Sequence, residues 1–174
     1  AQAWHPDDLV PRTVRALKRR NLEPVATSTV ERNTVDVAKA VAEIVPKNAN
    51  AVVQISAYKS CAAFIREARK AGYGGTFFNV SFVGTQALAD ELKNEGAGVM
   101  ISQVMPFPYT ASVPITREFQ AAAAKAGGTV QTNYSSLEGY LAAKVFTEGL
   151  KRAPKNATRE QLIAGLESIQ RADF

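Results

Sequence analysis

Residues that could perform acid–base or nucleophilic chemistry are scarce in this sequence. The 174 residues include one histidine, His5, and one cysteine, Cys61. A Ser-His-Asp or Cys-His arrangement needs a histidine base, and a zinc site of the common kind needs several His or Cys ligands. Because His5 lies in an N-terminal segment without a helix or strand pattern, we expect no catalytic residues, no metal site and no cofactor.

The clustered glycines do not have the order of a phosphate-binding loop. Such a loop follows a strand and opens a helix. Gly72, Gly74 and Gly75 instead follow an expected helix and precede an expected strand, so we interpret them as a helix stop and a turn. Cys61 falls inside the same helix, where a small buried thiol is the simpler interpretation.

Side chains suited to binding a small molecule follow two of the expected strands. Ser56 and Tyr58 come after the apolar segment 51–55, and residues 79–83 combine backbone amides, a hydroxyl and an aromatic ring at the end of the next. In open parallel α/β sheets, ligands bind beyond the carboxyl ends of the strands. This mixture suits a ligand with a polar end and an apolar body. One alternative stays open, in which Ser56 and Ser81 only cap helices and Tyr58 packs in the core.

The elements that must position these residues alternate between strand and helix patterns. Short β-branched or apolar segments predict strands, and apolar residues three or four apart predict helices. In chain order we expect helix 12–20, strand 24–30, helix 34–45 with Thr34 as its N-cap, strand 51–55, helix 60–71, strand 76–80, helix 85–93 and strand 98–104. This order predicts an α/β fold with a parallel sheet and helices on both of its faces.

The alternation stops at Pro106-Phe107-Pro108, which indicates a linker or crossover. Beyond it we expect only helices, over 115–126 and after capping boxes at 135–138 and 158–161. The chain therefore divides into an irregular segment (1–11), an α/β ligand-binding lobe (12–106) and a crossover with a helical segment (107–174). These helices have no sheet of their own, so they cover the sheet of this chain or one outside it.

Composition and charge exclude two classes of partner. The net charge of +5 is modest, and the densest basic run, Lys18 to Arg20, ends an expected helix, where cations complement the helix dipole. We therefore expect no nucleic-acid binding. No apolar run approaches the roughly 18 residues that span a bilayer, so the chain is not membrane-spanning. Residues 1–10 lack a signal-peptide pattern, and we expect any export signal to have been removed.

Three segments make the fold more specific. Residues 66–73, 79–84 and 134–140 resemble the periplasmic solute-binding proteins of ABC importers, of the branched-chain amino-acid-binding (Leu/Ile/Val-binding, type I) family, and the similarity spans about 15–168. The resemblance implies two α/β lobes that close on a ligand. This chain would hold the second lobe, and its last helices would pack on a first lobe that it lacks. The resemblance also implies a periplasmic protein (or an extracellular, lipid-anchored one), a small-molecule ligand and a membrane permease as partner.

The resemblance also assigns individual residues. Tyr58 matches the family's aromatic ligand contact, and Tyr134 matches the tyrosine that begins the long helix and often faces the cleft. Ser81 stands where amino-acid binders place an acid that pairs with the ligand ammonium. Because serine supplies no countercharge, a different small carboxylate or an aromatic acid is the better expected ligand. The candidate ligand-binding residues are Ala57, Tyr58, Ser81, Phe82, Val83 and Tyr134.

Three hypotheses follow for function. The first is the solute-binding component of an ABC importer, capturing an amino acid, a small carboxylate or an aromatic acid between two lobes. The second is a ligand-sensing domain of a receptor or regulator with the same fold. An α/β enzyme is the least supported, since it would need a reactive acid or base at Ser81, Glu91 or Glu95. We therefore expect that the chain is not an enzyme.

Overall fold

The computed structural model describes residues 9–170, so His5 lies outside the described residues. The chain forms two compact units, one up to Val104 and one from Met105, which are described separately. Leu9–Pro11, expected to be irregular, instead begin the first helix; the rest of the expected irregular segment lies outside the described residues.

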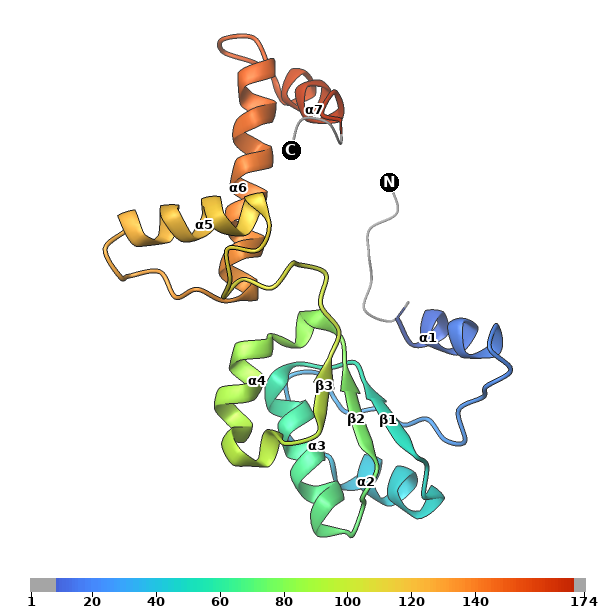
Figure 1. The fold of residues 1–174 in the computed structure, drawn as a ribbon. Coiled ribbons are helices and arrows are strands. Elements are labelled where there is room, and N and C mark those ends of the chain that lie inside the picture. Colours follow the sequence, from blue (N-terminus) through green and yellow to red (C-terminus); the bar gives the residue numbers. More distant parts are fainter. Residues whose placement is uncertain (1–8, 171–174) are drawn as a thin grey trace. The chain divides into compact units, whose positions relative to one another are not determined.

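The first unit contains a three-stranded parallel sheet in the order β1-β2-β3 (Figure 1). Its elements are α1 (Leu9–Lys18), α2 (Ala38–Ile44), η2 (Val45–Lys47), β1 (Ala51–Gln54), α3 (Tyr58–Lys70), β2 (Thr76–Asn79), η3 (Ser81–Val83), α4 (Thr85–Leu92), η4 (Lys93–Gly96) and β3 (Val99–Ile101). The expected α/β class with a parallel sheet is confirmed. A helix connects β1 to β2 and another connects β2 to β3, as parallel strands require.

The core of this unit lies between the sheet and its helices. Phe77 at the middle of β2 is 1% exposed, and its ring packs edge-on against Phe64 of α3 and Tyr73, with centroids 6.4 and 5.2 Å away. Because side chains alternate along a strand, the next residue, Phe78, points to the opposite face. Phe78 and its register partners Val53 and Met100 are exposed. The helices α2, α3 and α4 therefore build their core on the Phe77 face.

Two sequence predictions in the first unit are wrong. Residues 24–30 do not form the expected strand, because β-branched composition favours a strand only where a neighbouring strand can pair with it. Thr34 does not cap α2, whose N-cap is Val37. The Thr34 hydroxyl instead donates to the Glu31 carbonyl, and its own carbonyl accepts a 2.6 Å hydrogen bond from Ser60.

The second unit contains three longer helices, α5 (Pro114–Lys125), α6 (Tyr134–Arg152) and α7 (Arg159–Glu167). The capping box at Thr158 and Gln161 is confirmed, with hydrogen bonds of 2.9 and 3.3 Å. The box expected from Ser135 is displaced: α6 is capped by Asn133, which pairs reciprocally with Ser136. The Asn133 side-chain oxygen accepts from the Ser136 N–H, whereas a Ser135 cap would accept from the Glu138 N–H, so the helix begins two residues earlier than expected.

Helices α6 and α7 cross closely, as Figure 1 shows. Gly149 and Gly165 are both buried at this crossing. A Cβ atom on Gly165 would lie only 2.6 Å from the Gly149 carbonyl oxygen. Glycine is thus required here because the two backbones approach each other, and not because of an unusual backbone angle. None of the described helices is long and apolar enough to cross a membrane.

Candidate ligand-binding site

The residues predicted after β1 and β2 emerge at the same edge of the sheet. The two strands are parallel, and their last residues, Gln54 and Asn79, are register partners. Ala57 and Tyr58 follow β1 directly, and Ser81 opens the short helix that follows β2. The fold therefore places both segments beyond the carboxyl ends of adjacent strands, where ligands of parallel α/β sheets bind.

The segment after β1 is held by the first turn of α3. Ala57 is the N-cap of α3, with an extended backbone and no side-chain cap hydrogen bond, and Tyr58 is the first helical residue. Ala57 is exposed, whereas Tyr58 is half-buried and its ring packs partly on the core. The Lys59 ammonium lies 6.0 Å from the centre of that ring. An aromatic face, a cation and free helix N–H groups thus lie together at this point.

The segment after β2 forms the one-turn helix η3. Ser81 is half-buried, Phe82 is 46% exposed, and Val83 is 3% exposed within the core. Gly84 ends η3 with a φ of 80° and is the N-cap of α4. Of the three predicted residues, the side chains of Ser81 and Phe82 are therefore accessible, while only the backbone of Val83 is left to face a ligand.

The structure bears on the interpretation of the two serines as helix caps. Ala57 caps α3 and Gly84 caps α4, so neither Ser56 nor Ser81 serves as a cap of these α-helices. The Ser56 carbonyl accepts a 3.4 Å hydrogen bond from the Cys61 thiol. The ligand-binding role of Ser81 stays a prediction.

Tyr134 lies in the second unit, as the first residue of α6. Its ring is surrounded edge-on by Phe107 and Tyr109, with centroids 6.5 and 6.2 Å away. The structure thus places Tyr134 in an aromatic cluster with the residues of the predicted crossover. Two of its members, Phe107 and Tyr109, are about half exposed, so the cluster offers a ring surface to solvent.

The acids named for an enzymatic function do not lie at this edge. Arg66 of α3 binds the carboxylates of Glu91 at 3.0 Å and Glu95 at 2.7 Å, near the start of β3 and hence at the amino edge of the sheet. The hydrogen bonds that the Arg66 guanidinium donates to the carboxylates of Glu95 and Glu91 raise the pKa of Arg66. Over residues 9–170, no group of three or more His, Cys, Asp or Glu residues could hold a metal ion.

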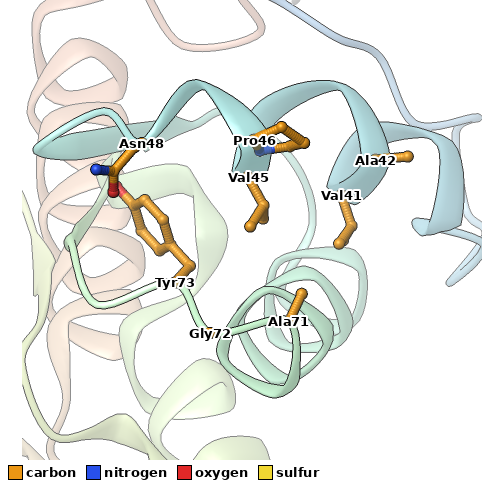
Figure 2. A pocket seen from close by; sticks show the side chains of 8 residues that line it. All are labelled: Val41, Ala42, Val45, Pro46, Asn48, Ala71, Gly72 and Tyr73. Atoms are coloured by element: carbon orange, nitrogen blue, oxygen red, sulfur yellow. The ribbon is translucent and has the colours of Figure 1, made fainter.

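An open hollow of about 430 Å³ lies at the same amino edge, and Figure 2 shows it between η2 and the end of α3. It is lined by Val41, Ala42, Val45, Pro46, Asn48, Ala71, Gly72 and Tyr73. Its walls are mostly apolar, and it includes none of the predicted site residues. Without convergent polar groups, this hollow is a weaker ligand site than the carboxyl edge.

The sequence interpretation missed two buried amides at the carboxyl edge. Gln54 is 8% exposed and Asn79 is 3% exposed. The sequence did contain a signal, since each residue is the polar last residue of its strand and follows two apolar residues. Cys61, in contrast, is buried as expected, and desolvation raises the pKa of its thiol to about 12 against the smaller opposing effect of its hydrogen bond to Ser56.

Comparisons with known proteins agree with the fold. The sequence model of the periplasmic binding protein family matches residues 3–174, and the chain belongs to this family. It is similar to a substrate-binding periplasmic protein from Ralstonia solanacearum (28% identity, TM-score 0.82) and to an extracellular ligand-binding receptor from Verminephrobacter eiseniae ef01-2 (30% identity, TM-score 0.74). Each alignment covers 92% of this chain and 46% of the other.

A third solved structure extends the comparison. It is a possible leucine/isoleucine/valine-binding protein from Rhodopirellula baltica SH 1, with 28% identity, a TM-score of 0.74, and coverage of 79% of this chain and 38% of that one. No curated protein matches the chain. The chain therefore spans less than half the length of the solved structures it matches. The family inferred from the three sequence segments is confirmed.

Proposed function

We propose that the chain is the second lobe of a periplasmic solute-binding protein that delivers a small organic solute to an ABC-importer permease. The observation that carries the proposal is the position of Tyr58 and Ser81, which both follow the carboxyl ends of two adjacent parallel strands. Family membership supports it. The solute would be held between this edge and a first lobe, and the protein would bind it without chemical change.

The chemistry of the edge favours a small carboxylate with an apolar or aromatic body. The uncapped N-terminus of α3 and the Lys59 ammonium favour negative charge. Tyr58 and Phe82 supply ring surface for the apolar part. Ser81 supplies a hydroxyl and no charge, so a ligand ammonium would find no countercharge there. We therefore propose an aromatic or aliphatic carboxylate in preference to an α-amino acid.

The test is calorimetric titration of the full-length gene product with 4-hydroxybenzoate, benzoate, L-leucine and L-phenylalanine. We expect micromolar or tighter binding of at least one carboxylate. Tyr58→Ala should weaken that binding about tenfold or more, since aromatic anchors dominate binding free energies. Phe78→Ala is the matched control, because Phe78 is a partly exposed aromatic residue on the sheet face away from the core.

Two outcomes would contradict this proposal. If a folded protein binds none of the four compounds, the solute class is wrong. If Phe78→Ala weakens binding as much as Tyr58→Ala, the carboxyl edge is not the site. Ser81→Asp tests the ligand class separately: the new carboxylate should weaken binding of benzoate and strengthen binding of L-leucine.

A further inference from the structure

A pair of buried amides lies beneath the proposed ligand site. Gln54 and Asn79 end β1 and β2 as register partners, so their side chains project on the same side of the sheet. Asn79 is two residues from Phe77, which packs on α3, so this is the side covered by that helix. Three of the four amide atoms, Gln54 Oε1 and both Asn79 atoms, are buried without a hydrogen-bond partner.

The fourth amide atom connects the strand to the helix. Gln54 Nε2 donates a 3.3 Å hydrogen bond to the backbone carbonyl of Cys61. Cys61 in turn donates from its thiol to the Ser56 carbonyl at 3.4 Å and from its backbone N–H to the Ala57 carbonyl at 3.0 Å. The end of β1, the segment 55–57 and the first turn of α3 are thus joined through one residue, Cys61.

Fold stability does not explain an amide at position 54. A buried acceptor without a partner is destabilising, whereas an apolar side chain of the same length would fill the space without that cost. The glutamine at position 54 is therefore explained by the hydrogen bond that its Nε2 atom donates to the Cys61 carbonyl. That contact fixes the turn from which Tyr58 projects, because Tyr58 lies between Ala57 and Cys61 in the same helical turn.

We propose that Gln54 is a positioning residue: through the Cys61 carbonyl it fixes the segment 55–57 and thereby holds Tyr58 in place for the ligand. The inference rests on the proposed function. Asn79 provides an internal comparison, since it is an equally buried amide on the neighbouring strand whose side chain has no partner in α3. Removing the amide at position 54 should affect binding, and removing it at position 79 should not.

The experiment compares Gln54→Met with Asn79→Leu in the full-length gene product. Both variants replace an amide by an apolar group of similar size. The probes are 4-hydroxybenzoate and L-leucine, titrated calorimetrically, and the thermal midpoint is measured for each variant. For whichever probe the unchanged protein binds, Gln54→Met should raise the Kd roughly three- to tenfold at an unchanged or higher thermal midpoint. Asn79→Leu should leave the Kd within about twofold.

Amide hydrogen exchange supplies a readout that does not depend on the ligand. In Gln54→Met the amides of Cys61 and Ala62, in the first turn of α3, should exchange roughly three- to tenfold faster. The amides of Arg69 and Lys70, in the last turn of the same helix, should be unchanged. Gln54→Leu serves as a second variant, because it also removes the donor to the Cys61 carbonyl without burying a charge, and it should reproduce both effects.

The outcomes separate the two proposals. If the unchanged protein binds a probe and Gln54→Met binds it equally well, the positioning role is wrong and the proposed function stands. If amide hydrogen exchange in the first turn of α3 is also unaltered, the Gln54–Cys61 hydrogen bond does not restrain that turn. If the unchanged protein binds neither probe, benzoate and L-phenylalanine are titrated in their place; if it binds none of the four compounds, the proposed ligand class fails, and the positioning role fails with it.

Discussion

Replacing Asn79 by leucine should make the protein more stable, although the residue is almost completely buried. Asn79 is 3% exposed, and both Oδ1 and Nδ2 lack a hydrogen-bond partner in the structure. Burying a polar group without a partner costs about 1–3 kcal/mol. Leucine has nearly the same shape and no polar atom, so the substitution removes that cost.

The magnitude follows from two opposing contributions. Removing the two unpartnered polar atoms contributes about 2 kcal/mol or more, if each atom counts for the low end of that range. Fitting a branched methyl pair into a packed site costs about 1 kcal/mol at the low end of overpacking penalties. We therefore expect Asn79→Leu to raise the free energy of unfolding by about 1–2 kcal/mol. Asn79→Asp should lower it by several kcal/mol, because the carboxylate would be buried without a countercharge.

The assay is urea unfolding followed by circular dichroism, combined with hydrogen exchange of the β2 amides. The exchange measurement is needed because the chain forms two units, which can unfold separately. Slower exchange of the backbone amides of residues 78 and 79 in Asn79→Leu would confirm the expected gain in the free energy of unfolding. A loss of more than about 1 kcal/mol would refute the reasoning, since it would mean that the amide is satisfied in solution, for example by ordered water.

Three further predictions concern other parts of the chain. Gly165→Ala should lower the free energy of unfolding of the second unit by about 1–3 kcal/mol, measured by urea unfolding, because its Cβ would meet the Gly149 carbonyl; an unchanged midpoint would show that the helices can separate freely. Cys61 should not react with a thiol reagent in the native protein at pH 8 and should react after unfolding, because burial raises the pKa of its thiol to about 12; rapid native labelling would contradict this. Hydrogen bonds from Lys144 and then Tyr140 lower the pKa of Glu118. The Lys144–Glu118 ion pair therefore stabilises the fold at pH values above the unfolded-state pKa of Glu118, and this stabilisation is lost as pH falls through the folded-state pKa. Lys144→Met should therefore cost less than about 1 kcal/mol at pH 7, since the pair is partly exposed, and the difference from the unchanged protein should vanish in acid unfolding curves.

The alternation of short apolar segments and amphipathic helices was enough to predict the parallel α/β fold. The strands at 51–55, 76–80 and 98–104 are confirmed as β1, β2 and β3; β1 and β2 are one residue shorter than expected, and β3 covers only Val99–Ile101. The pattern is informative because short apolar strands joined by amphipathic helices are typical of parallel βαβ units. The segment 24–30 is also rich in β-branched residues but does not pair, because pairing depends on a neighbour that composition does not encode.

Helix boundaries were predicted where side chains alone decide them. The box at Thr158 and Gln161 is confirmed, since both hydrogen bonds are local to four residues. Thr34 does not cap α2 because its hydroxyl donates to the Glu31 carbonyl and its own carbonyl accepts a hydrogen bond from Ser60, 26 residues away. Local signals are reliable when no distant group competes for the same backbone atoms.

For the candidate site, the sequence by itself determined which segments lie at the carboxyl edge of the sheet. Tyr58 and Ser81 follow consecutive parallel strands, and that order alone requires them to emerge on one side of the sheet. Which atoms face outward was decided only by tertiary structure. Val83 turns into the core, while Phe82 beside it is exposed, and Gln54 lies under the site bonded to Cys61. These outcomes depend on packing between α3, η3 and the sheet, that is, on contacts between residues far apart in the sequence.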